Sequence, residues 1–295
     1  MKSKKLASVL TAVGLGLALA SAPASAVIQF FFPTTTFEDN DLDFVFDNDG
    51  SNTISVGDRI VSVLEFGQTT GIFAGQGPTP IGPQELTGVI DITVVACPAG
   101  SPPGISCYAA SGATGVLSGF AANTVAVLWT DATPDLEVIN ATCGTRANCL
   151  ALAGLGGTDG STVFLTAGFF GDTNDYLFST GVVPTITGIQ AAGATTIVGS
   201  LNFGLDVGIN NTGQALGNIS CVPFCGPGGD GFVRINGSGS LLGGVGLPDF
   251  TQWTARSDND ASVNPLAVPE PASVALIGLA LAGLGAVRRR NRTAG

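Results

Sequence analysis

The 295-residue chain contains no histidine, and its three lysines all lie within the first five residues. Without these side chains, the Ser-His, Cys-His and Ser-Lys pairs of common nucleophilic enzymes cannot form. The G-x-S-x-G and P-loop motifs are also missing. Carboxylate pairs, as used by glycosidases, can still be drawn from residues 131–137 or 171–176. However, two tryptophans and two tyrosines offer few platforms for sugar rings. We therefore predict a protein that is not an enzyme.

Basic residues are also scarce in the middle of the chain. Residues 27–264 hold four arginines against 21 aspartates and glutamates, a formal charge of −17. Such a surface repels phosphate backbones, so nucleic acid is excluded as a partner, whereas divalent cations or an acidic extracellular matrix suit it. The acidic residues are scattered among Val, Ile, Leu and Phe, which predicts a folded segment with one substantial core.

The N-terminus has the three parts of a secretory signal. A basic start with Lys2, Lys4 and Lys5 precedes the apolar run 6–20 and the small-residue site Ala24-Ser25-Ala26. The apolar run is too short to span a bilayer comfortably. We predict a signal peptide over residues 1–26, export through the Sec pathway, and a mature protein that begins near Val27.

Six cysteines follow the signal peptide, and they form three pairs that are local in sequence. In an exported chain an even number of cysteines indicates disulfides. The spacing favours three pairs: Cys97 with Cys107, Cys143 with Cys149, and Cys221 with Cys225. The alternative, a metal site, requires C-x-x-C spacing or histidine partners, which this chain lacks.

Strand patterns dominate between the termini. Residues 201–210 alternate apolar and polar positions with a period of two. Further β-branched or aromatic runs lie at 85–96, 124–130, 161–170 and 231–237, separated by Gly, Pro, Asn and Asp. We predict an all-β fold, an antiparallel β-sandwich or barrel-like ectodomain over 27–254, flanked by the N-terminal signal helix and a C-terminal apolar helix. A Gly-rich β-solenoid is the alternative, although no repeat of fixed period supports it.

Other segments have simpler predictions. The proline-rich stretch 75–84 is expected to be a loop, and Trp129 is expected in the core. Phe30–Phe32 can be core, an edge strand or an exposed adhesive patch, of which core is favoured. Residues 255–267 lose the apolar period and gain Asp, Asn, Ser and Pro, which predicts an extended linker.

The stretch DNDGSNTISVGD, residues 47–58, is the best candidate for a metal site. Its oxygen-bearing residues fall at the spacing that can wrap a chain around calcium: Asp47, Asp49, Ser51, Thr53 through its carbonyl, Ser55 and Asp58. The stretch resembles the calcium loop of EF-hands, and more closely that of dockerin modules. It departs from them with Asn52 at the usual glycine and with the shorter Asp58 at the last position. The alternative is a solvated turn rich in Asp and Asn.

The C-terminus joins three parts in order. Val268-Pro269-Glu270-Pro271 is extended, residues 272–287 are apolar or small, and an arginine cluster closes the segment: Arg288, Arg289, Arg290 and Arg292. Sixteen helical residues reach about 24 Å, short of a hydrocarbon core of about 30 Å. This length favours a transient span of the inner membrane, with the arginines on the cytoplasmic side.

This arrangement resembles the PEP-CTERM sorting signal of Gram-negative bacteria, over residues 268–292. The resemblance implies recognition and cleavage by an exosortase, followed by release to or fixation at the cell surface. Such proteins are associated with exopolysaccharide, biofilms and flocs. We therefore expect a surface or extracellular matrix protein with a structural or adhesive role, and polysaccharide or other surface proteins as partners. The alternatives are a carbohydrate-binding adhesin and a hydrolase built on carboxylates.

Overall fold

The computed structural model of the chain describes residues 28–266. The gaps within this range are residues 74, 100, 102, 139–142, 158–159, 172, 182–184, 223–224 and 226–228. The predicted signal peptide and the predicted C-terminal sorting segment lie outside the described residues. Among the described residues, no helix is long and apolar enough to cross a membrane.

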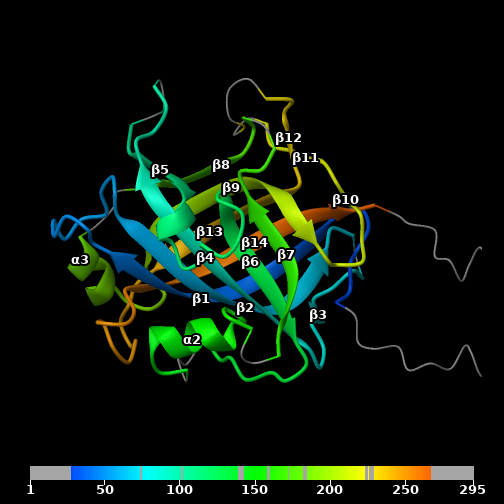
Figure 1. Cartoon of the computed structure of the whole chain (residues 1–295), viewed down its shortest axis with the longest axis horizontal. Helices are drawn as coiled ribbons and strands as arrows, with labels where there is room; N and C mark the ends of the chain where they lie inside the picture. Colours follow the sequence, from blue (N-terminus) through cyan, green and yellow to red (C-terminus); the bar gives the residue numbers. More distant parts are fainter. Residues whose placement is uncertain are drawn as a thin grey trace, which may run out of the picture.

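Eight antiparallel strands close into a barrel, as the sequence predicted (Figure 1). Around the barrel they are β1 (Thr35–Phe46), β2 (Arg59–Gly71), β4 (Glu85–Val95), β6 (Thr124–Asp131), β7 (Thr162–Gly168), β9 (Ile197–Asn210), β13 (Ile235–Leu242) and β14 (Ala255–Pro265). The ring closes because β14 pairs with β1. Closure leaves these strands without an unpaired edge along the ring.

Shorter elements decorate the barrel. A second wall segment of two strands connects the end of β4 to the start of β9, through β5 (Ile105–Ala110) and β8 (Tyr176–Thr180). The other elements are β3 (Thr79–Pro80), the 3₁₀ turn η1 (Gly112–Thr114), α2 (Arg146–Leu152), α3 (Ile186–Ala191), β10 (Leu216–Gly217), β11 (Ile219–Ser220) and β12 (Phe232–Val233). The helix α2 lies against the outside of the barrel wall (Figure 1).

The prediction of a linker over 255–267 is wrong for residues 255–265, which form the barrel strand β14. Its inward positions carry small or polar side chains, Ser257 and Asn259, while Asp258 and Asp260 are exposed. No apolar period marks such a strand, because its inner face meets polar groups of β1. The ectodomain therefore extends to Pro265 instead of ending at residue 254.

The other strand predictions are confirmed, because each β-patterned run contains a strand. The proline-rich stretch 75–84 is a loop that adds only the two-residue strand β3 to the edge of β2. The three disulfides are those that the spacing favoured, Cys97–Cys107, Cys143–Cys149 and Cys221–Cys225. Each bridge closes a local loop.

The apolar side chains form two separate clusters, one inside the barrel and one outside it. The inner cluster includes Phe37, Leu86 and Phe203. The outer cluster lies between the wall and the segment that contains α2, and both Trp129 and Trp253 belong to it. Phe31 is also buried, whereas Phe32 is 58% exposed, so the prediction of a buried Phe30–Phe32 stretch holds only in part. Both faces of β4 and β6 are largely buried, which explains the nearly continuous apolar runs in these two strands.

Candidate metal site

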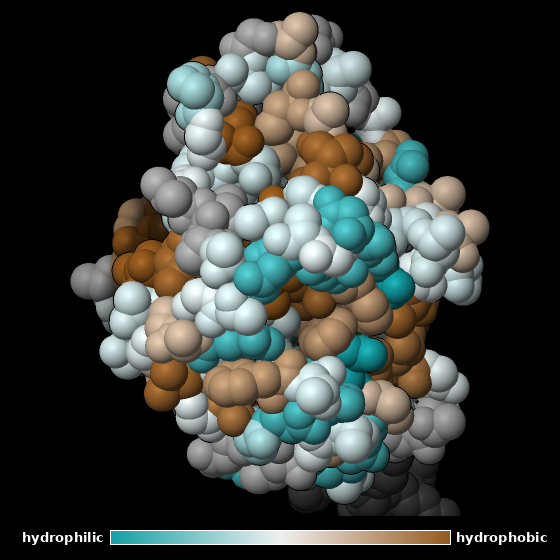
Figure 2. Space-filling model, turned by 90° about the vertical axis from the view of Figure 1, so that its left-hand side faces the viewer, coloured by the Kyte–Doolittle hydropathy of each residue, from teal (hydrophilic) through white to brown (hydrophobic). Residues whose placement is uncertain are grey.

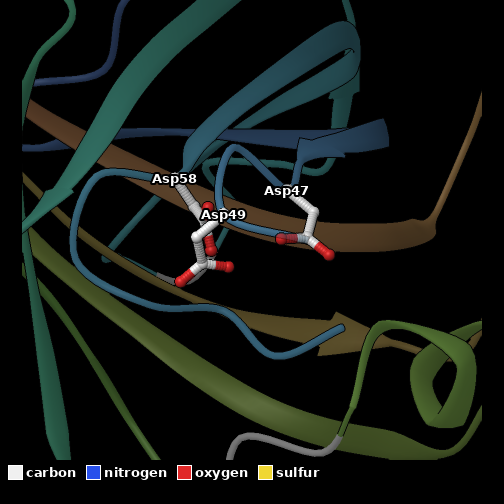
Figure 3. A group of neighbouring side chains, drawn as sticks. All are labelled: Asp47, Asp49 and Asp58. Atoms are coloured by element: carbon white, nitrogen blue, oxygen red, sulfur yellow. The ribbon is translucent and has the colours of Figure 1, made fainter. Parts of the chain in front are cut away.

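The loop from Asp47 to Asp58 connects β1 to β2 at one end of the barrel. The last residue of β1, Phe46, pairs with the first residue of β2, Arg59. The first and last aspartates therefore flank the mouth of a hairpin (Figure 3). The EF-hand resemblance is limited to the loop, because strands and not helices flank it. The residues that follow the loop, from Arg59 on, form β2.

Three of the six predicted ligands come together. Asp47, Asp49 and Asp58 each offer one carboxylate oxygen, and these oxygens lie within 4.8 Å of one another. Oxygen atoms on opposite sides of a calcium ion are about 4.8 Å apart, because calcium–oxygen distances are about 2.3–2.6 Å. The donor set is thus of the right size and chemistry for a hard divalent cation.

Hydrogen bonds hold these carboxylates in place. The Ser55 hydroxyl donates to Asp49 Oδ2 at 2.9 Å and to Asp58 Oδ2 at 3.2 Å, so it bridges two of the candidate ligands. Hydrogen bonds from Ser51 and Ser55 lower the pKa of Asp49 to about 2. Asp49 is therefore ionised at every physiological pH, as a metal ligand requires.

Asp58 closes the loop. Its side chain is buried and accepts the Asn48 N–H at 2.8 Å through Oδ1 and the Ser55 N–H at 2.7 Å through Oδ2. Both oxygens thus already serve backbone donors from the two halves of the loop. The shorter aspartate at this position favours loop closure over the bidentate coordination that glutamate gives in EF-hands.

Asn52 fills the position that EF-hands give to glycine. Its φ is 59°, so it adopts the left-handed backbone, which asparagine tolerates better than most residues. Its carbonyl accepts the Ile186 N–H at 2.9 Å, and its side-chain oxygen accepts the Thr187 N–H at 3.2 Å. These bonds fasten the loop to the first turn of α3, near the left end of the barrel in Figure 1.

Ser51 and Thr53 do not join the carboxylates as ligands in this arrangement. The Ser51 hydroxyl donates to the Thr53 carbonyl at 3.0 Å. That carbonyl was the predicted ligand at the seventh loop position. Thr53 also forms an isolated β-bridge with Thr185, next to α3. In this conformation the loop presents three carboxylates and the Ser55 hydroxyl rather than six ligands.

A layer of carboxylates inside the barrel was not predicted from the sequence. Asp39, Asp41 and Asp43 alternate along β1, face inward and are buried. Asp39 accepts the Asn259 N–H at 2.8 Å, and Asp41 accepts the Ser257 hydroxyl at 3.0 Å. Burial, and next the charges of Asp39 and Asp43, hold the pKa of Asp41 well above its ordinary value. The signal was aspartate at every second position of a strand, which usually indicates a solvent face.

The comparisons with known proteins concern only the C-terminus. Residues 267–290 match the family model of the PEP-CTERM protein-sorting motif. The chain has no significant match among curated proteins and none among solved structures. The motif implies exosortase processing and a surface or extracellular location, in agreement with the resemblance given above. We conclude that the barrel is the cargo of a chain that carries a PEP-CTERM protein-sorting motif.

Proposed function

We propose that this protein is a non-enzymatic component of the cell surface or extracellular matrix, in which calcium bound at the Asp47–Asp58 loop promotes adhesion. Export through the Sec pathway and the 1–26 signal peptide would deliver it, and an exosortase would process the sorting motif. Polysaccharide or other surface proteins would be its partners.

The observation that carries this proposal is that the chain ends and the Asp47–Asp58 loop lie at opposite ends of the barrel. Thr35, near the start of the barrel, pairs with Val263 near its end, so both chain ends leave from the same end of the barrel. The Asp47–Asp58 loop lies at the opposite end (Figure 1). A barrel held by its C-terminal segment therefore presents this loop away from its point of attachment.

The loop end also exposes apolar side chains. The starts of β2, β9 and β14 and the end of β13 lie at this end, as their pairing registers require. Its exposed apolar residues are Val56, Ile197, Val245 and Phe250. On this face hydrophobic patches alternate with hydrophilic ones (Figure 2). Apolar side chains beside acidic ones suit contact with other surfaces when calcium reduces the repulsion between acidic molecules.

The structure offers few exposed aromatic rings on which a sugar could stack, so it supports the sugar-binding adhesin less well than the matrix role. Both tryptophans are buried, with Trp129 3% and Trp253 0% exposed. Tyr108 is also buried, and its hydroxyl is hydrogen-bonded to Ser179 at 2.8 Å. The four side chains that the sequence offered for stacking thus reduce to Tyr176, which favours the matrix role over a sugar-binding adhesin.

The test is calcium-dependent association of the purified protein, followed by light scattering in EDTA and in millimolar calcium. We expect calcium to promote association of the native chain, and the double variant Asp47→Asn, Asp49→Asn to lose this response. The control variant Asp258→Asn, Asp260→Asn removes the same charge from two exposed positions on β14, and it should keep the response. Equal loss in both double variants would show that net charge, and not the loop, is responsible, and would refute the proposal.

The sorting step has its own test. Deletion of residues 268–295 in the native host should change both the location of the protein and cell aggregation. An unchanged location would contradict processing through the sorting motif.

A further inference from the structure

A second group of carboxylates lies on the outer face of the barrel, away from the β1–β2 loop. Glu85, the first residue of β4, pairs with Asp131, the last residue of β6. Directly paired residues on antiparallel strands have neighbouring side chains on one face. Asp135 belongs to the segment that follows β6, and this segment runs back past Glu85. Each of the three carboxylates offers one oxygen, and the three oxygens lie within 4.8 Å of one another.

Glu85 holds the following segment against the wall. One of its oxygens accepts the Leu136 N–H at 3.0 Å, and the other accepts the Asp135 N–H at 3.4 Å. Leu136 is buried in the outer apolar cluster. The carboxylate of Asp135 is thereby brought next to two buried carboxylates, since Glu85 is 6% exposed and Asp131 5%.

The arginines of the described chain are all engaged elsewhere. Arg59 pairs with Asp91 at 2.6 Å, and Arg234 lies 3.9 Å from Asp206. The other two arginines lie over the rings of Phe44 and Phe46 (Arg146) or donate to a backbone carbonyl (Arg256). Burying like charges together is costly unless a cation compensates them.

Asp131 supplies the observation that points to a ligand. Its Oδ1 accepts the Thr133 N–H at 2.8 Å, whereas its Oδ2 is buried without a hydrogen-bond partner among the described residues. A buried carboxylate oxygen without a donor is unfavourable. A water molecule would supply a donor but would not offset the repulsion among three carboxylates. A divalent cation would coordinate the unpaired oxygen and would also offset this repulsion.

The cluster is accessible to a hydrated ion. A groove of about 420 Å³ lies beside it and is lined by Glu65, Glu85, Asp135 and Glu137. Calcium takes six to eight oxygen ligands and tolerates irregular geometry, so waters from the groove can complete a set of three carboxylates. Magnesium demands stricter octahedral geometry and gives up its waters reluctantly.

We propose that Glu85, Asp131 and Asp135 form a second calcium site, which fastens the segment after β6 to the barrel wall. The proposal is independent of the Asp47–Asp58 loop and of any adhesive role. Because Glu85 and Asp131 lie on neighbouring strands and Asp135 on the segment that crosses them, the bound ion would join three parts of the chain.

The test counts bound calcium per chain by equilibrium dialysis in a background where the loop is silenced by Asp47→Asn with Asp49→Asn. We expect this protein to retain one calcium ion and to lose it when Asp131→Asn is added. Glu65→Gln is the matched control, because Glu65 lines the same groove but accepts the Val138 N–H at 2.8 Å and is not in the cluster. This control should keep the ion.

A second variant covers the case in which Asp131→Asn fails to fold. Asp135 is exposed, so Asp135→Asn should leave the fold intact, as checked by near-ultraviolet circular dichroism, and weaken calcium binding at least tenfold. Absence of bound calcium in the loop-silenced protein at millimolar calcium would refute the proposal, as would binding that neither variant changes. Calcium-dependent association that persists in the loop-silenced protein would refute only the role of the loop, because the count of bound calcium tests the second site separately.

Discussion

Replacing Asp41 by asparagine should stabilise the barrel at pH 8. Asp41 is 1% exposed, and its Oδ1 is buried without a hydrogen-bond partner among the described residues. The charges of Asp39 and Asp43 disfavour its ionised form further. Asparagine keeps the shape and the acceptor for the Ser257 hydroxyl, removes the charge and places a donor where the unpaired oxygen was.

The size of the stabilisation expected from Asp41→Asn follows from the unpaired Oδ1 of Asp41. An unsatisfied buried polar group costs about 1–3 kcal/mol. For a domain of this size, 1 kcal/mol corresponds to about 3 °C in Tm. The variant Asp41→Asn should therefore melt about 3–9 °C higher than the native protein at pH 8.

The pH dependence gives the sharper test. Because burial raises the pKa of Asp41 in the folded state, the folded protein keeps this proton at pH values where the unfolded chain has released it. The carboxyl thus costs no stability below the unfolded pKa, and stability is lost as the pH rises through the folded pKa. The gain from Asp41→Asn should shrink toward zero near pH 4.

Thermal melts from pH 4 to pH 8, in EDTA, measure this gain. Asp258→Asn removes an exposed charge from the neighbouring strand β14, and its effect should be small over the whole range. A lower Tm for Asp41→Asn at pH 8 would refute the reasoning. So would a gain of the same size at pH 4 and pH 8.

Two further predictions concern packing and are measured by urea unfolding. Gly237→Ala should destabilise by about 1–3 kcal/mol, because its Cβ would meet the Phe203 ring and the Asp260 carbonyl, whereas Gly67→Ala, with open space around it, should be nearly neutral. Trp253→Ala should cost about 3–5 kcal/mol, and Trp253→Phe less than half of that, because the Trp253 ring N–H is buried without an acceptor among the described residues. Equal costs for the two glycines, or for the two Trp253 variants, would contradict these accounts of the packing.

Much of the fold could be predicted because its signals are local. The pairing of Cys97 with Cys107 follows from sequence proximity in an exported chain, and the alternation over residues 201–210 marks β9. Asn52 could be assigned a left-handed backbone because asparagine tolerates it better than most residues. The closure of the ring between β1 and β14 could not be predicted, because it joins segments about 220 residues apart.

Of the two candidate metal sites, one could be predicted from the sequence and the other could not. The oxygen spacing of the Asp47–Asp58 loop is visible in the sequence because one short loop holds every member. The cluster of Glu85 with Asp131 and Asp135 is not, since it depends on the register of β4 against β6 and on the path of the segment that follows. The acidic residues of 131–137 are visible in the sequence, but no local signal places Glu85 next to them.

The sequence by itself determined the sorting motif, the local disulfides and the all-β class, because each is encoded in neighbouring residues or in a short period. Only the tertiary structure decided which polar strands are buried. In a closed barrel the inward face of β1 meets that of β14, so Asp39, Asp41 and Asp43 can be satisfied in part by Ser257 and Asn259. In β1 and β14 the alternation of polar residues therefore did not reveal, from the sequence alone, that the polar face is buried.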